Sequence, residues 1–481
     1  MFKKIITLVL FLIGFISFSQ EIVSSFPLDF KGNRDVFQIV NDSTKVTTFF
    51  ICDKEKIKAI RLNKEMQVVD SLSTNRINHE VYVGMIGNNG DDQNPNLFWS
   101  SPNRKEILVQ RFNFEIHKVT TQNYVLSLKD ERSLQSFSQN GRFYLLTVLK
   151  NSDKLKLYVF DANGKLEEKI IDLAGFKFYK SDYQKTTLYG FLSESLFASN
   201  SSFSLQKISS ENPTSLVKSS MKRKCYLNGN TLVMTFDTNI DYTQLITLNL
   251  EAYTATEKFI KKPYLYSIDP TFLTSNSFLI DNKLYQIKSS SSQIILTLKN
   301  LDDNLLKTYA ASDRTPSIDF KNTEIIQEDG NASKKRILET SAQFIRKMNN
   351  LNAGISCYKL NDNYLITLGS VSEEAPSGSA MLIGGMFGVA GVLIAAAISS
   401  PTMESFNSYA NRRVVYINCL FDKEANHING EIQPLAFDKI RIFADKNADI
   451  SSQTLFKMDG SYYLGYHDKN TKEYTIRKFE D

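Results

Sequence analysis

Two loops of the chain carry side-chain oxygens at the close spacing that a hard cation needs. In the first loop, Asp237, Asn239 and Asp241 alternate with uncharged residues, and proteins bind Ca²⁺ through carboxylate and amide oxygens of this kind. The second loop, residues 91–96, reads DDQNPN. The first loop lacks the glycine and the distant glutamate of an EF-hand loop. We therefore name Asp237, Asn239 and Asp241 as calcium candidates, although a hairpin turn is the preferred interpretation of both loops.

The remaining polar residues form no catalytic motif. Four histidines are scattered along the chain, and the sequence contains no zinc-protease, nucleophile-elbow, phosphate-loop or dinucleotide-binding motif. A glycosidase needs two carboxylates that face one cleft, and the sequence does not place such a pair. The sequence therefore predicts no catalytic residue and no cofactor-binding residue, and calcium is the only cofactor that it suggests.

The four cysteines are widely spaced and form no C-x-x-C pair. An exported chain could oxidise them, but four cysteines allow three different pairings. Disulfides and buried free thiols therefore both stay open for the following residues: Cys52, Cys225, Cys357 and Cys419. Zinc is not expected, because no two ligands lie close together in the sequence.

Short strands must position these residues. The chain contains 33 Phe and 22 Tyr, residue types that favour β-strands. Asn, Asp and Gly lie between the apolar runs and favour turns. Apolar runs are joined in pairs by short polar turns at residues 47–62, 143–160 and 462–477. Such pairs predict β-hairpins, so we expect a mostly β protein.

The hairpins recur at a period near 45 residues. Successive strand centres near Ile60, Val109, Tyr158, Leu205 and Ile246 are separated by 40 to 50 residues. This period predicts a β-propeller with about seven blades, in a range of six to eight. Tandem β-sandwiches are the alternative fold, since no propeller signature such as a Trp-Asp dipeptide is present. We expect residues 20–481 to form a single β-propeller-like domain.

An insertion at residues 331–350 interrupts the strand pattern. We predict a short amphipathic helix over 332–349, because apolar residues recur there at spacings of three and four: Ile337, Leu338, Phe344, Ile345 and Met348. Its basic residues suggest contact with an anionic membrane as one interpretation. Glu339 and Gln343 interrupt the basic face, so packing on the β body is preferred.

A second insertion, residues 375–411, is apolar and rich in glycine. Residues 380–398 are all apolar or Gly, which predicts a helical segment almost long enough to cross a bilayer and makes it a transmembrane candidate. Gly384 and Gly388 have the G-x-x-x-G spacing of closely packed helices. We expect these residues to contact a membrane or a partner helix: Leu382, Ile383, Gly384, Phe387, Gly388, Gly391, Leu393 and Ile394.

Topology weighs against a single crossing of the membrane. Residues 364–368 and 414–419 resemble strands that flank the insertion, and if they pair, both ends of the insertion lie on the same side. Half of the apolar run is about ten residues long, which is too short to span a bilayer. We therefore favour contact from one side, with a true crossing and packing on protein as the alternatives.

The N-terminus is typical of an exported protein. Lys3 and Lys4 precede an apolar run at residues 5–16, and Ser17 and Ser19 supply the small residues of a cleavage site. This pattern predicts a signal peptide over residues 1–19. The net charge of +5 on 481 residues is close to neutral, so no nucleic-acid partner is expected. The predicted location is the periplasm or cell envelope, in association with a membrane.

These features together predict an exported, membrane-associated, non-enzymatic binding or scaffolding protein with a β-propeller-like fold and an unknown ligand. Its expected partner is a membrane, or a helical membrane protein, through residues 380–398, and self-association through the same segment is the other possibility. The alternative function is an extracytoplasmic hydrolase that acts on glycans or peptides, with a site assembled across several blades.

Overall fold

The computed structural model describes residues 21–28, 35–195, 201–265, 273–329, 335–371, 400–410 and 413–481. Within these ranges the chain forms seven small sheets of four or five strands and one two-stranded ribbon. Nearly all neighbouring strands run antiparallel, because consecutive strands of a sheet are joined as hairpins. The prediction of a mostly β protein is therefore confirmed.

The first three sheets follow the chain without a crossover. Sheet 1 contains Asp35–Asn41 (β2), Val46–Cys52 (β3), Lys56–Leu62 (β4) and Val68–Asn75 (β5). Sheet 2 contains Gly84–Asn89 (β6), Asn96–Ser100 (β7), Glu106–Asn113 (β8) and Lys118–Val125 (β9). Sheet 3 contains Glu131–Gln139 (β10), Arg142–Leu149 (β11), Lys154–Phe160 (β12) and Leu166–Asp172 (β13).

A small connecting unit precedes the next two sheets. It contains the ribbon Phe178–Tyr179 (β14) and Lys185–Thr186 (β15), followed by Leu188–Ser193 (α2). Sheet 4 contains Gln206–Ile208 (β16), Arg223–Asn228 (β17), Thr231–Phe236 (β18), Tyr242–Asn249 (β19) and Thr254–Lys261 (β20), with Leu216–Ser219 (α3) between its first two strands. Sheet 5 contains Thr274–Ile280 (β21), Lys283–Ser289 (β22), Gln293–Asn300 (β23) and Leu305–Ser312 (β24).

The chain segments that form the last two sheets also contain the helices described for the C-terminal third of the protein. Sheet 6 has the order Lys335–Leu338 (β26), Ile325–Asp329 (β25), Arg413–Phe421 (β29), Asn363–Val371 (β28) and Asn352–Leu360 (β27). Sheet 7 has the order Ile22–Pro27 (β1), Glu473–Phe479 (β32), Ser461–Asp468 (β31) and Ile450–Met458 (β30). The helices are Ser341–Asn350 (α4), Pro401–Ala410 (α7) and Ala436–Lys446 (α8).

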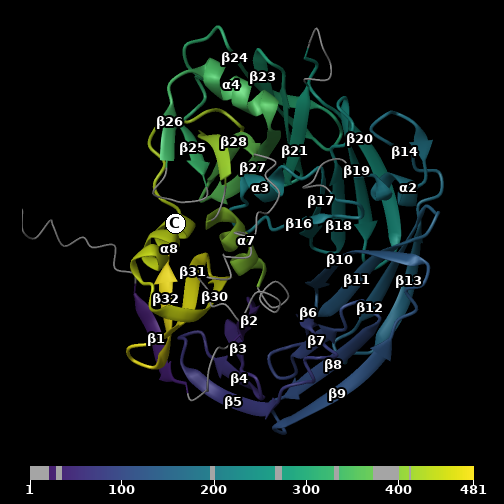
Figure 1. Cartoon of the computed structure of the whole chain (residues 1–481), viewed down its shortest axis with the longest axis vertical. Helices are drawn as coiled ribbons and strands as arrows, with labels where there is room; N and C mark the ends of the chain where they lie inside the picture. The colour runs from purple at the N-terminus through teal and green to yellow at the C-terminus, as the bar shows by residue number, and fades with distance from the viewer. Residues whose placement is uncertain are drawn as a thin grey trace, which may run out of the picture.

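The sheets succeed one another around the molecule in chain order, with the earliest strand of sheets 1 to 5 nearest the middle (Figure 1). Shared aromatic contacts join neighbouring sheets. Phe98 of sheet 2 stacks on Phe143 of sheet 3 with ring centroids 4.4 Å apart. Phe49 of sheet 1 meets Phe456 of sheet 7 at 5.6 Å. Burial of these rings is the main favourable term that holds one sheet against the next.

The position of a strand within its sheet explains its composition. The second strand of sheet 3, β11, reads RFYLLTVL, and six of its eight side chains are buried because neighbouring sheets cover both of its faces. The outermost strand β13 reads LEEKIID and is mostly exposed, as predicted for a solvent-facing edge. The three predicted hairpins are also confirmed, since β3 pairs with β4, β11 with β12, and β31 with β32.

The predicted helix over 332–349 is only partly correct. Residues Lys335–Leu338 are a strand, β26, which pairs with β25 in the register Ile325↔Leu338. The helix α4 begins at Ser341, and the Thr340 hydroxyl caps it by accepting a hydrogen bond from the Gln343 backbone N–H at 3.2 Å. Phe344, Ile345 and Met348 form its buried face, as expected. Pairing with the preceding strand, β25, therefore overrides the helical spacing of the first apolar residues.

The insertion at 375–411 leaves and re-enters one sheet at the same end. β28 and β29 pair from Tyr364↔Phe421 to Val371↔Val414, which confirms the expected flanking hairpin. Residues 372–399, with all the expected membrane-contact residues from Leu382 to Ile394, lie outside the described residues, as do residues 1–20 with the predicted signal peptide. Of this insertion the structure describes α7 and the residues next to it.

The prediction of a transmembrane candidate is wrong. Among the described residues, no helix is both long enough and apolar enough to cross a bilayer. Strand pairing supplies a physical reason for rejecting a single crossing at 380–398, because β29 lies beside β28 in sheet 6. A crossing between these two strands would place adjacent strands on opposite sides of the membrane. The predicted contact of this segment with a partner remains a prediction.

All four cysteines are buried free thiols, which settles the alternative that the sequence left open. Cys357 and Cys419 lie on β27 and β29 of sheet 6, with β28 between these two strands. Burial raises the pKa of Cys52 and of Cys225 to about 12. These thiols therefore behave as small apolar core residues.

Candidate ligand-binding cavity

The interface between sheets 6 and 7 differs from the interfaces between the other neighbouring sheets. In the described residues, α7 and α8 lie between them, and α7 packs against α8 and β30. The apolar side chains of both helices join those of sheet 7 in one cluster, which includes Phe406, Phe437 and Leu455. The helices therefore cover sheet 7, and the face of sheet 6 turned toward them has a different composition.

Strand alternation explains this composition. Cys357, Ile366 and Cys419 belong to the core cluster that sheet 6 shares with sheets 4 and 5. Their sequence neighbours Ser356, Thr367 and Asn418 point to the opposite face, because successive side chains of a strand alternate. The register pairs Ser356 with Thr367 and Thr367 with Asn418. A row of three polar side chains therefore crosses the sheet opposite α8.

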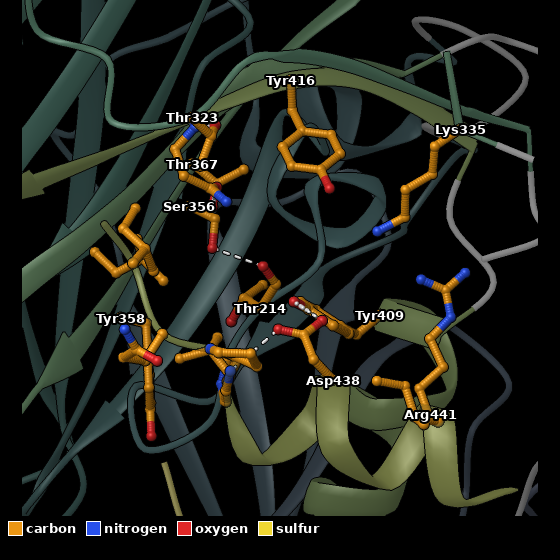
Figure 2. A pocket seen from close by; sticks show the side chains of 18 residues that line it. Thr214, Thr323, Lys335, Ser356, Tyr358, Thr367, Tyr409, Tyr416, Asp438 and Arg441 are labelled. Atoms are coloured by element: carbon orange, nitrogen blue, oxygen red, sulfur yellow. Dashed lines mark hydrogen bonds between the residues drawn. The ribbon is translucent and has the colours of Figure 1, made fainter. Parts of the chain in front are cut away.

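A cavity of about 320 Å³ lies between this polar face and the helices. Figure 2 shows Thr323, Thr367 and Ser356 on one side of it, and Lys335 and Arg441 on the other. Apolar side chains complete the lining: Pro213, Leu365, Ile432, Pro434, Leu435 and Ile442. The volume is at the lower end of the range for small-molecule sites, which is about 300–1,000 Å³.

A buried carboxylate contacts three side chains that line the cavity. Glu328, on β25, is fully buried and accepts hydrogen bonds from the Tyr416 hydroxyl at 2.7 Å and from Arg441 Nη1 at 3.2 Å. The Lys335 ammonium lies 3.4 Å from the same carboxylate. We call Glu328, Arg441 and Lys335 the charged corner. Its one carboxylate serves two cations.

Arg441 has an unused donor. Its Nη2 atom is buried and has no hydrogen-bond partner in the part of the chain that the structure describes, and the residue is only 7% exposed. A buried donor without a partner costs about 1–3 kcal/mol. This donor is therefore expected to find an acceptor in the cavity that Arg441 lines.

The first turn of α8 positions Arg441. The Asp438 carboxylate accepts hydrogen bonds from the Leu435 backbone N–H at 3.1 Å and from the Tyr409 hydroxyl at 2.9 Å. A negative charge at this position also stabilises the helix N-terminus. Asp438 and Arg441 are three residues apart and so lie on the same side of the helix. The helix cap thus fixes the direction in which the arginine points.

A second cavity, of about 410 Å³, lies at the ends of inner strands. Its lining comes from sheets 1, 4, 5, 6 and 7 and includes four acidic residues and two lysines: Asp42, Glu211, Asp281, Asp459, Lys359 and Lys457. Tyr358 lines both cavities. Its hydroxyl donates to the Asp481 carboxylate and lies 3.2 Å from the Tyr462 hydroxyl, and burial raises its pKa well above the ordinary value.

The calcium candidates make hydrogen bonds to other groups of the protein, and calcium binding by them remains a prediction. Asp237, Asn239 and Asp241 lie in the connection between β18 and β19, as the preferred hairpin interpretation requires. The Asn239 side chain accepts from the backbone N–H of Asp241 at 2.8 Å, and the Asp241 carboxylate accepts from the Tyr183 hydroxyl at 3.0 Å. Among the residues of known placement, no group of three His, Cys, Asp or Glu could hold a metal ion.

The carboxylate of Asp237 forms ion pairs with two lysines. It is fully buried, 2.9 Å from the Lys224 ammonium and 3.3 Å from that of Lys262, and it accepts hydrogen bonds from Thr243 and Ser277. Although burial opposes its charge, the two ammonium groups hold the pKa of Asp237 well below the ordinary value. Lysine side chains thus occupy the positions around this carboxylate that a cation would take.

Sequence reasoning missed the charged corner. Lys335 is one of the basic residues of the helix predicted over 332–349, and Glu328 and Arg441 are 113 residues apart in the chain. The one local indication is Asn418, a polar residue within the otherwise apolar strand predicted over residues 414–419.

The chain matches no protein-family model and no curated protein. Solved structures resemble the chain only weakly, as three of them illustrate. A member of the DUF4221 family from Bacteroides vulgatus has a TM-score of 0.30 and 9% identity, over 93% of this chain and 99% of that one. The WD40 domain of SCAP from fission yeast has a TM-score of 0.27 and 9% identity, over 95% and 98%. Cobalt-substituted ACO from Synechocystis has a TM-score of 0.27 and 7% identity, over 59% and 64%.

The chain therefore spans slightly less than two thirds of the length of the Synechocystis structure. At these TM-scores the similarity carries no argument about function. The case for the cavity rests on the residues of this chain alone.

Proposed function

We propose that this protein is an exported, non-enzymatic binding protein with a seven-bladed β-propeller-like fold, and that it holds a small polar ligand in the cavity between sheets 6 and 7. The observation that carries the binding role is the charged corner, where Arg441 lines the polar cavity and its buried Nη2 has no hydrogen-bond partner among the described residues.

The order of the sheets supports the propeller interpretation. Each of the seven sheets has at least four strands, and they follow one another in chain order. The strand β1 joins the last sheet by pairing with β32, in the register Ser25↔Thr475, which is how a ring of blades is closed from both chain ends. One cavity lined by five of the sheets also agrees with strands that converge on a common axis.

The carboxyl groups at the cavity favour binding over hydrolysis. Glu328 holds two cations and a tyrosine hydroxyl. Asp438 holds a backbone N–H and the Tyr409 hydroxyl. A general acid or base must be free to exchange a proton with its substrate. These two carboxyl groups are instead used to build the walls of the cavity.

A ligand screen tests the proposal. The mature protein is titrated with sugars, sugar acids, amino acids and short peptides, and its unfolding temperature is measured. A ligand that binds only the folded protein raises this temperature. Thr367→Phe, which fills the cavity, should abolish the rise. The control Thr256→Phe, on the exposed face of β20, should preserve it. A rise that persists in Thr367→Phe would place the ligand elsewhere.

Export is tested separately. The signal predicted over residues 1–19 should be absent from the mature protein, and N-terminal sequencing of protein purified from its natural source measures this directly. A mature chain that begins at Met1 would contradict export.

A further inference from the structure

Among the residues that the structure describes, the charged corner holds two cations and one carboxylate. Arg441 and Lys335 share the single negative charge of Glu328. The nearest other acid in the lining, Asp438, is held by the N-terminal turn of α8 and by Tyr409. A buried charge is stable only when it is paired. Arg441 is buried and has this pairing in Glu328, whereas the Lys335 ammonium is about half exposed and can pair with a further anion in the cavity.

The available donors define the shape of the anion. Arg441 binds Glu328 through Nη1, so its buried Nη2 remains for a second acceptor. Lys335 is about half exposed and lines the same cavity. Figure 2 shows both side chains on one side of the cavity. A guanidinium edge beside an ammonium matches the two oxygens of a carboxylate.

The opposite wall is suited to hydroxyl groups. Ser356, Thr367 and Asn418 form a row across the sheet, and Thr214, Thr323 and Gln433 extend it. Hydroxyl oxygens that already donate, such as Ser356 Oγ to the Thr214 carbonyl at 2.6 Å, can still accept hydrogen bonds. The wall therefore offers both donors and acceptors to a ligand that carries several hydroxyls.

The geometry points to a hydroxylated monocarboxylate of sugar-acid type as the ligand class of this cavity, with its carboxylate on Arg441 and Lys335 and its hydroxyls on the row of sheet 6. This inference rests on the proposed binding function. The volume of about 320 Å³ suits a ligand of one or two sugar rings.

Calorimetric titration tests the inference with matched probes. Glucuronate and galacturonate supply both features, glucose and galactose lack the charge, and cyclohexanecarboxylate lacks the hydroxyls. At least one uronate should bind about tenfold more tightly than its neutral sugar and than cyclohexanecarboxylate, because hydrogen bonds to charged groups are the strong ones. Added salt should weaken uronate binding.

Variants locate the carboxylate. Lys335→Gln should weaken uronate binding about tenfold and leave the neutral sugars unchanged. Its matched control is Lys359→Gln, an exposed lysine of the same sheet that lines the other cavity. Arg441→Gln should weaken binding further, and if it fails to fold because Glu328 loses its partner, Lys335→Gln decides the question.

The outcomes separate the two proposals. Equal binding of uronates and neutral sugars, or unchanged binding in Lys335→Gln, overturns the carboxylate and leaves the binding function intact. Tight binding of cyclohexanecarboxylate overturns the role of the hydroxyl row. If no uronate binds, the sugar-acid inference fails, whereas the binding function falls only if the broad screen also produces no ligand that Thr367→Phe excludes.

Discussion

The buried carboxylate of Asp237 offers the sharpest test of how sheets 4 and 5 are held together. Asp237→Asn keeps the size of the side chain and removes its charge. The ammonium groups of Lys224 and Lys262, at 2.9 and 3.3 Å, then lose their only carboxylate partner within the cluster. Breaking a buried ion pair from one side costs about 3–5 kcal/mol. Since domains are stable by about 5–15 kcal/mol, the loss is a large fraction of the total.

Urea denaturation at pH 7 measures this loss as a change in the free energy of unfolding. The matched control is Asp241→Asn in the same turn, whose side chain is 64% exposed and should contribute less than about 1 kcal/mol. Adding Lys224→Met to Asp237→Asn should recover part of the loss, because it removes one unpaired charge. Equal, small effects of Asp237→Asn and Asp241→Asn would refute the reasoning.

Three further predictions concern the whole molecule. The free energy of unfolding should rise from pH 7 to about 8, because burial lowers the pKa of Lys222 to about 7 and that of Lys262 to about 8, and the unfolded chain then binds more protons than the folded one. It should fall again above about pH 9, where the buried thiols keep protons that the unfolded chain loses. A flat profile in urea titrations at several pH values would contradict this. Deletion of residues 21–28 should lower the unfolding temperature by several degrees, because it exposes the edge of β32. An unchanged unfolding temperature would show that β1 does not stabilise sheet 7. The four cysteines are Cys52, Cys225, Cys357 and Cys419. A thiol reagent should label none of them in the folded protein at pH 8 and all four in urea. Rapid labelling of the native chain would show that a thiol is accessible and would contradict their burial.

The strands could be predicted because their information is local. Residues 47–62 contain two apolar runs and a polar turn, and the pairing of β3 with β4 follows directly from them. The helix over 332–349 was misplaced because residues 335–338 satisfy two patterns at once. Their spacing suits a helix, but β25 offers them a pairing partner that periodicity does not reveal.

The site could not be predicted because its members are distant in the chain. Glu328 and Arg441 come from a strand and a helix separated by 113 residues, and neither stands in a motif. The loop at Asp237 shows that a local pattern of residues can also mislead. Its carboxylate and amide residues have the same spacing whether the carboxylate meets calcium or lysine, and Lys262 lies 25 residues away, beyond the next hairpin.

The pairing of β1 with β32 has a consequence for the timing of folding. Residues about 450 positions apart must meet before sheet 7 is complete, so this sheet cannot form until the C-terminus has been synthesised. Contacts of such long range slow folding. Until the final residues arrive, the edge of β31 lacks the cover that β32 gives it in the folded chain.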